Sequence, residues 1–376
     1  MKGYLCVEQQ NKTPVAKKRN SEALLAIFFI LLCFFIAILS VVLLARSCSM
    51  SPDKGDTSDS ESETTTETPP PVDVPVFAGG TVPTPPYASS STAAISASLA
   101  SQYVALVNAE TGEIVASLNS NARFSPASMT KVMTLIVACE MLNEDDLDAK
   151  LTMTQEIYDY VRSGDYFGST IFGIDVGDEY VLRDLLYGIG MESASDCVMP
   201  VVLYLCDSEA DFAVLMNQKA TELGLKNTKF DNAIGYDSEN NYTTAEDMAV
   251  IMAYAMQSDL IRDILGKETY RSYAAGYNSS GEYVPSFGFT FYSTLFGSHD
   301  SSRMSAYKSH YGTAFSLKTS RLLAGKTGYL TDNHCLVTYI SANSGGTKYV
   351  LILGGSAQKQ YRTMADLKEI LDTYIP

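Results

Sequence analysis

A serine and a lysine three residues apart are the first candidates for chemistry in this sequence. The segment Ser128-Met129-Thr130-Lys131 opens a stretch that stays apolar on nearly every side as far as Leu142. On a helix this spacing places the hydroxyl and the amine on the same face. Burial lowers the pKa of a lysine, so its free amine can accept the serine proton. We therefore predict Ser128 as a nucleophile and Lys131 as its base.

The spacing alone is weak evidence, because Ser51 with Lys54 and Ser305 with Lys308 repeat it. An isolated Ser-x-x-Lys is usually a solvated pair with no chemical role. The copy at Ser128 differs because it opens an apolar helix, where a lysine is otherwise costly.

Two further short motifs follow in chain order, Ser193-Ala194-Ser195 and Lys326-Thr327-Gly328. The second begins a predicted strand, where its cation and hydroxyl can hold a carboxylate and its glycine lets a peptide backbone approach closely. A phosphate-binding loop is excluded, because that motif needs glycine at position 320, where the chain has Ser320.

The periodicity around these motifs predicts an α+β fold. Residues 103–107 and 114–118 read as a hairpin, and residues 325–330, 335–340 and 349–353 as three strands joined by short turns. Together they predict an antiparallel five-stranded sheet, with a buried helix over 128–142 and a last helix over 358–374. Ser208 with Asp211, and Thr244 with Asp247, predict the starts of two more helices.

The composition limits the partners of the chain. With 376 residues, 46% of them hydrophobic, the chain can bury a large core. A net charge of -16 and a pI near 4.6 argue against a nucleic-acid partner, which would need a basic surface. The three histidines do not form a metal-ligand set, and no metal site is predicted.

The N-terminal region predicts a membrane anchor. Residues 23–45 are apolar and long enough to cross a bilayer as a helix, and the region after them fits a signal-peptide cleavage site poorly. Basic residues precede this run, so residues 1–22 are predicted to be cytoplasmic. Residues 46–99 read as a disordered Ser/Thr/Pro-rich acidic linker that leads to an extracytoplasmic domain over 100–376. Within this domain, residues 270–320 are rich in Tyr, Ser and Gly with weak periodicity, and they are predicted to form an elaborated loop insertion.

From about Tyr103 to Tyr374 the chain resembles the low-molecular-weight penicillin-binding proteins that act as D-alanyl-D-alanine carboxypeptidases. The similarity is carried by 126–134 around Ser128, by 227–230 leading to Gly235, by 243–249 and by 325–329. The resemblance implies the fold shared by β-lactamases and penicillin-binding proteins, with a mostly helical subdomain beside the sheet. It also implies a protein that needs no cofactor, whose partners are peptidoglycan stem peptides and covalently inhibiting β-lactams. The predicted span over residues 23–45 places this protein in the cell membrane.

The resemblance also implies the roles of single residues. Ser128 attacks the carbonyl of the penultimate D-alanine, Lys131 acts as general base and Ser193 relays the proton to the leaving amine. The residues implied to bind the substrate are Ser195, Lys326, Thr327, Gly328 and Tyr329. Backbone N–H groups of Ser128 and Tyr329 are implied to stabilise the oxyanion.

One departure from the family pattern keeps other functions open. The middle motif of the family usually ends in asparagine, whereas this chain has Ser195, which replaces an amide by a shorter hydroxyl. A catalytically impaired relative that only binds cell-wall peptides is therefore an alternative. A β-lactamase is a weaker one, because no glutamate stands in a recognisable deacylation loop. A transpeptidase or an endopeptidase would use the same residues.

Overall fold

The computed structural model describes residues 75–95, 98–162, 170–272, 276–277, 283–284, 289–299, 302–331 and 333–376. Residues 71–376 form one compact unit. The predicted cytoplasmic tail (1–22), the predicted membrane span (23–45) and the predicted linker as far as residue 74 lie outside the described residues. Within the described ranges, no helix combines the length and the apolar character that crossing a membrane requires.

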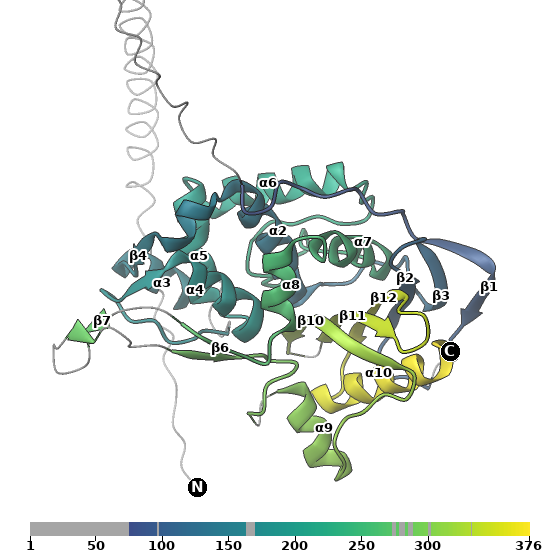
Figure 1. Cartoon of the computed structure of the whole chain (residues 1–376). Coiled ribbons are helices and arrows are strands. Elements are labelled where there is room, and N and C mark those ends of the chain that lie inside the picture. Colours follow the sequence, from purple (N-terminus) through teal and green to yellow (C-terminus); the bar gives the residue numbers. More distant parts are fainter. Residues whose placement is uncertain are drawn as a thin grey trace, which may run out of the picture. The chain divides into compact units, whose positions relative to one another are not determined.

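The centre of the fold is a six-stranded sheet with the order β1-β3-β2-β12-β11-β10 (Figure 1). Its strands are β1 (Tyr87–Ala94), β2 (Tyr103–Asn108), β3 (Glu113–Leu118), β10 (Ser320–Leu330), β11 (Asn333–Ala342) and β12 (Lys348–Ser356). The predicted hairpin and the three predicted C-terminal strands are confirmed, and all five pair antiparallel. The two groups join where β2 pairs with β12, with Leu106 opposite Leu351.

The prediction of five strands was wrong by one, because β1 adds a parallel edge strand beside β3. β1 lies within the segment predicted to be a disordered linker, so the folded region begins before residue 100. Its side chains are mostly exposed, and polar bonds fix it instead: Ser89 and Ser91 donate to the Glu113 carboxylate at 2.6 and 2.7 Å. A strand held in this way lacks the apolar alternation that reveals strands in a sequence.

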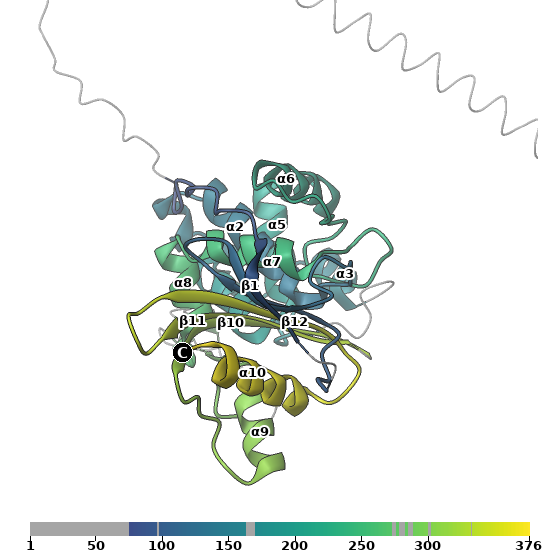
Figure 2. The same ribbon diagram turned by 90° about the vertical axis from the view of Figure 1, so that its right-hand side faces the viewer.

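Helices cover both faces of the sheet (Figure 2). One face packs against α7 (Ala245–Ala255) and α8 (Asp259–Gly266), and the other against α10 (Gln360–Tyr374). The helix α2 (Lys131–Met141) packs against α7 and α8. Alternate residues of the central strands therefore enter two separate cores. On β12, Val350 and Ile352 belong to the larger core, whereas Leu351 and Leu353 belong to the core under α10.

The helical part lies between β3 and β10 in the chain and contains most of the larger core. The predicted buried helix is confirmed as α2, in which every residue from Lys131 to Cys139 is buried. The predicted caps are also confirmed: Ser208 Oγ accepts from Asp211 N at 3.1 Å, and Thr244 Oγ1 from Asp247 N at 3.0 Å. The other elements are η1 (Ala127–Thr130), η2 (Glu144–Asp148), β4 (Lys150–Thr152), α3 (Gln155–Arg162), β5 (Glu179–Val181), α4 (Leu182–Tyr187), η4 (Gly188–Glu192), α5 (Ser195–Leu205) and α6 (Glu209–Glu222).

Residues 270–320, predicted to be an elaborated loop, contain regular structure. The two-stranded pairs are β6 (Thr269–Arg271) with β9 (Thr290–Tyr292) and β7 (Gly276–Tyr277) with β8 (Tyr283–Val284), and a helix follows, α9 (Arg303–Tyr311). Ser302 Oγ caps α9 by accepting from Ser305 N at 3.2 Å, and Gly312 ends it with a φ of 70°. The sequence does not predict this helix, because too few of its side chains are apolar to show a helical periodicity.

Candidate active site

Ser128 and Lys131 lie side by side at the start of the buried helix. Ser128 belongs to η1, a 3-10 turn that runs directly into α2, and Lys131 is the first residue of α2. A 3-10 turn eclipses residues three apart, and Lys131 Nζ lies 3.2 Å from Ser128 Oγ. Lys131 is 1% exposed, and its Nζ also contacts the Ile234 carbonyl oxygen at 2.5 Å. The two residues predicted as nucleophile and base are thus within hydrogen-bond distance.

Burial lowers the pKa of Lys131 to about 7, against the opposing negative charge of Glu209. The cause is desolvation, which disfavours the ammonium form in an apolar surrounding. At neutral pH a large share of Lys131 is therefore an uncharged amine that can accept a proton. A lysine with an ordinary pKa would be almost wholly protonated and could not act as a base.

Ser193 and Lys326 bring the second and third motifs together. Ser193 follows the π-helical turn η4 and has a left-handed backbone with a φ of 62°, a conformation that costs about 1–3 kcal/mol and clusters at functional sites. Lys326 Nζ donates to Ser193 Oγ at 2.8 Å and to the Thr327 carbonyl at 2.9 Å. Both side chains belong to buried residues, so this contact is shielded from water.

Burial, together with the positive charges of Lys131 and Arg303, holds the pKa of Lys326 well below its usual range. Among the described residues, Lys326 forms no ion pair with a carboxylate. An anion that enters the site would favour the charged form of Lys326 again. The position is therefore suited to a ligand that brings its own negative charge.

Ser195, predicted to bind substrate, lines the same cavity as Ser128 and Lys131. It is 1% exposed, and its hydroxyl has no hydrogen-bond partner within the described part of the chain. A buried hydroxyl without a partner costs free energy unless a ligand satisfies it. Ser195 is thus placed to receive a polar group of a bound molecule.

The residues after Lys326 lie along β10, which packs beside η1, the turn that carries Ser128. Thr327 Oγ1 lies 2.7 Å from Thr294 Oγ1, and Tyr329 is 59% exposed at the mouth of the site. A Cβ on Gly328 would meet the Pro126 carbonyl oxygen at 3.0 Å and Ala127 Cβ at 3.2 Å. Glycine therefore allows close packing of β10 against η1, in addition to the close approach of a substrate backbone that the sequence predicts.

Two cavities meet at Ser128, with volumes of about 570 and 330 Å³. Thr170 and Tyr329 line both of them. The larger cavity contains Lys131 and Ser195, and the smaller contains Ser193, Thr327 and Arg303. A peptide that crosses Ser128 can therefore place one part in each cavity.

Arg303, the first residue of α9, is the main residue of this site that sequence reasoning missed. It is 3% exposed and donates to Thr363 Oγ1 at 2.6 Å and to the carbonyls of Gly328 and Cys335 at 3.0 and 3.1 Å. Burial lowers its pKa to about 10, so it stays charged at neutral pH. None of the ion pairs in the described ranges involves Arg303. The smaller cavity is thus lined by a buried cation that has no counter-ion among the residues that the structure describes.

The described residues contain no group of three or more histidine, cysteine, aspartate or glutamate side chains that could hold a metal ion. The serine, the two lysines and the arginine are the reactive and charged groups that the structure brings together at this site. A nucleophile, a neutral amine and an anion-binding end are the parts needed for acyl transfer to serine from an acid-terminated amide.

Comparison with known structures identifies an α+β fold like that of the penicillin-binding proteins. The chain resembles the crystal structure of a Streptomyces DD-transpeptidase, with a TM-score of 0.59 and 24% identity, over 74% of this chain and 99% of the other. It also resembles a D-alanyl-D-alanine carboxypeptidase from Mycobacterium tuberculosis, with a TM-score of 0.53 and 20% identity, over 70% and 88% of the two chains. At these identities the likeness shows the fold alone.

Sequence comparison identifies the family. The family model described as D-alanyl-D-alanine carboxypeptidase matches residues 89–282, just over half of the chain. The chain therefore belongs to the D-alanyl-D-alanine carboxypeptidase family, which the motifs indicated.

Individual relatives match over shorter stretches. D-alanyl-D-alanine carboxypeptidase DacF of Bacillus subtilis is 34% identical over 168 residues, which are 45% of this chain and 41% of the relative. D-alanyl-D-alanine carboxypeptidase DacC of Escherichia coli is 33% identical over 149 residues, which are 39% of this chain and 37% of the relative. The matched segment thus spans about two fifths of these relatives.

Proposed function

We propose that this chain is a serine-type D-Ala-D-Ala carboxypeptidase that removes the terminal D-alanine from peptidoglycan stem peptides through an acyl-enzyme. The observation that carries the proposal is the buried Lys131 amine, with a pKa of about 7, 3.2 Å from Ser128 Oγ where two cavities meet. Membership of the family supports the choice of substrate.

The proposed reaction begins when Ser128 Oγ attacks the carbonyl carbon of the penultimate D-alanine and its proton passes to Lys131. The oxyanion is held by the backbone N–H groups of Ser128 and Tyr329. The C–N bond then breaks, and the leaving amine takes a proton through Ser193. Water finally adds to the ester carbonyl, and Ser128 regains its proton as the shortened peptide leaves.

In this proposal the smaller cavity receives the leaving D-alanine. Its carboxylate is bound by Thr327 and Lys326, the hydroxyl and the cation of the third motif, and by the charge of Arg303. The larger cavity receives the acyl part of the peptide, with Ser195 as a polar contact.

We also propose that residues 23–45 anchor the protein in the cell membrane with the N-terminus in the cytoplasm, because of their apolar length and the basic residues before them.

The proposal is tested with the full-length protein in detergent. We expect a fluorescent penicillin to label it covalently, Ser128→Ala to prevent labelling, and the wild type to release D-alanine from diacetyl-L-Lys-D-Ala-D-Ala. Labelling without release of D-alanine would favour the impaired, peptide-binding relative that Ser195 suggests. Rapid turnover of benzylpenicillin would favour a β-lactamase. A folded protein that is not labelled would contradict the reactive serine.

We expect Arg303→Gln to raise the KM for the peptide by about 10- to 100-fold, because a hydrogen bond to a charged group contributes about 1.5–3 kcal/mol. The glutamine amide can still donate to a backbone carbonyl, which limits damage to the fold. Steady-state release of D-alanine measures the effect. Arg362→Gln is the matched control, because Arg362 contacts Tyr311 and lines neither cavity. An unchanged KM in Arg303→Gln would place the carboxylate elsewhere.

A further inference from the structure

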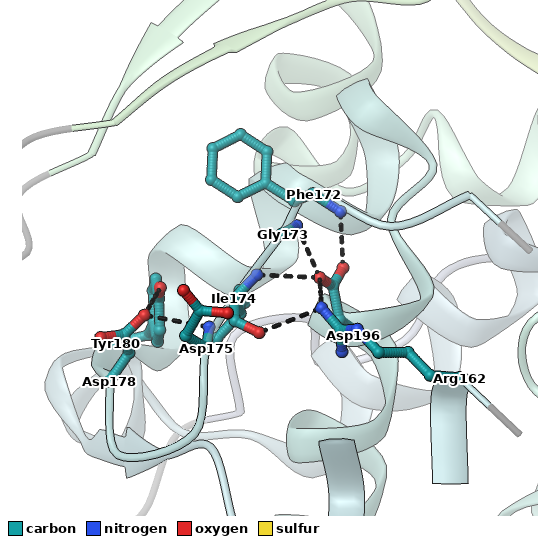
Figure 3. A network of polar contacts seen from close by, with 8 residues as sticks. All are labelled: Arg162, Phe172, Gly173, Ile174, Asp175, Asp178, Tyr180 and Asp196. Carbon is teal, nitrogen blue, oxygen red and sulfur yellow. Dashed lines mark hydrogen bonds and ion pairs between the residues drawn. The ribbon is translucent and has the colours of Figure 1, made fainter. Parts of the chain in front are cut away.

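A buried carboxylate that the proposed reaction does not use lies directly after Ser195. Asp196, in the first turn of α5, is 0% exposed. Its Oδ1 accepts from Phe172 N at 2.8 Å, and its Oδ2 accepts from Gly173 N at 2.8 Å and Ile174 N at 3.1 Å (Figure 3). One carboxylate thus satisfies three consecutive backbone N–H groups of a segment that is neither helix nor strand.

Two further contacts hold the same segment, residues 170–174, which we call the wall segment. Ser195 N donates to the Thr170 carbonyl at 2.8 Å, and Arg162 donates to the Ile174 carbonyl at 3.2 Å. Arg162 also forms an ion pair with Asp196 at 3.8 Å. The wall segment is therefore attached at both ends to the start of α5, the helix that carries Ser195. Hydrogen bonds to a charged acceptor are the strong ones, about twice the strength of neutral ones.

The wall segment faces the proposed reaction through Thr170. Thr170 lines both cavities, together with Ser128 and Tyr329. From the other side the ring of Phe172 packs against Phe291 of β9, with ring centroids 4.6 Å apart. Thr170 thus reaches the cleft from a backbone that is fixed on a packed support.

We propose that Asp196 is a positioning residue for substrate binding, which acts by holding the wall segment so that Thr170 contacts the bound peptide beside Ser128. This inference rests on the proposed carboxypeptidase function. Asp196 touches neither substrate nor reacting atoms, and the carboxylate acts only through the backbone that it orders. Loss of the carboxylate frees the wall segment, so that each binding event must order it again.

The test is the effect of Asp196→Asn on the kinetics of D-alanine release by the full-length protein. The asparagine keeps one acceptor oxygen, but its NH₂ group opposes a backbone N–H that the carboxylate satisfied. We expect KM to rise about tenfold, which is about 1.4 kcal/mol, with kcat lowered less than threefold. Rates are expressed per active site, titrated with fluorescent penicillin, so that partial unfolding does not enter the result.

Thr170→Ala separates positioning from simple stabilisation. If Asp196 acts through Thr170, the double variant Asp196→Asn/Thr170→Ala has the same KM as Asp196→Asn alone. If Asp196 affects KM independently of Thr170, the two effects on KM multiply. If Asp196 only stabilises the fold, Asp196→Asn changes the melting temperature and the active fraction while KM stays at the wild-type value. Either result would overturn the proposal.

Asp178→Asn is the matched control, because Asp178 accepts from Asp175 N at 3.0 Å and from the Tyr180 hydroxyl at 3.0 Å at the far end of the same loop (Figure 3). We expect it to leave KM unchanged, and a rise in KM equal to that of Asp196→Asn would count against the proposal.

If Asp196→Asn does not fold, Arg162→Met is the second variant. It removes the bond to the Ile174 carbonyl while leaving the three N–H bonds to Asp196, and we expect a KM about threefold higher. An unchanged KM in Arg162→Met would contradict the proposal that the position of the wall segment sets the affinity for the peptide. A wild type that penicillin does not label would contradict the proposed function instead.

Discussion

Replacing Lys131 with alanine is expected to lower the second-order rate constant of acylation by penicillin by about 10²- to 10⁴-fold, the usual contribution of a general base. Ser128 keeps its position in η1, but the amine that lies 3.2 Å from its Oγ is removed. The rate of covalent labelling, measured at several penicillin concentrations, gives the constant. The fold is expected to survive, because the change removes a buried amine that forms no ion pair in the described part of the chain.

Lys131→Arg is the matched control, since a guanidinium keeps a positive charge and cannot be deprotonated in a protein. It is expected to be as inactive as the alanine variant, and an active Lys131→Arg would show that charge and not basicity matters.

The dependence of acylation on pH is a second check on Lys131. Because the neutral amine is the active form and the pKa of Lys131 is about 7, acylation should rise about tenfold per pH unit below pH 7 and level off above it. A rate that is flat from pH 5 to 9 would contradict the assignment.

The second large effect is expected from Gly235→Ala. Gly235 has a φ of +82°, and a Cβ built on it would lie 2.0 Å from the Ala127 carbonyl oxygen and 3.0 Å from Ser128 N. Both contacts are with backbone, so the clash can be relieved only by a shift of backbone, either at position 235 or in the turn that carries Ser128. We expect acylation to fall about 100-fold, because a displacement of about 1 Å costs this much in a positioned site. The free energy of unfolding should fall by about 2–5 kcal/mol, from backbone strain and overpacking together.

Gly224→Ala separates the two causes of that effect. Gly224 has a φ of +74°, but a Cβ there would meet no atom of the described residues within 4 Å. This variant should lose about 1–2 kcal/mol of stability from backbone strain alone and keep wild-type acylation. Chemical denaturation and penicillin labelling measure both quantities. Equal loss of acylation in the two variants would mean that strain, and not the contact with Ser128, decides the activity.

The parts of the site that could be predicted from the sequence are those whose signal is local. Ser128 and Lys131 are three residues apart on one turn, so their contact follows from spacing. The strand that carries Lys326 and Thr327 was visible from its apolar pattern and its turn residues. That these two residues face the nucleophile came only from the family resemblance, because Lys326 meets Ser193 across 133 positions.

Arg303 and Asp196 could not be predicted, because their roles depend on partners that no local pattern connects. Arg303 contacts Gly328 and Cys335, 25 and 32 positions away, and at the start of a polar helix it looks like a solvated residue. Asp196 reads as an ordinary acidic residue in the first turn of a helix. Its bonds to backbone N–H groups more than 20 positions away exist only after the chain has folded.

The pairing of β2 with β12 has a kinetic consequence. It joins the first antiparallel strand to the last, and beside it Ser101 Oγ donates to the Asp366 carboxylate across 265 positions. Closing so long a loop is slow, because its entropy must be lost before the contacts are gained. β10 lies at the far edge of the sheet and reaches β2 only through β11 and β12. The cleft at Ser128 is therefore completed late, and newly made protein should acquire its reactivity toward penicillin only as the C-terminal strands dock.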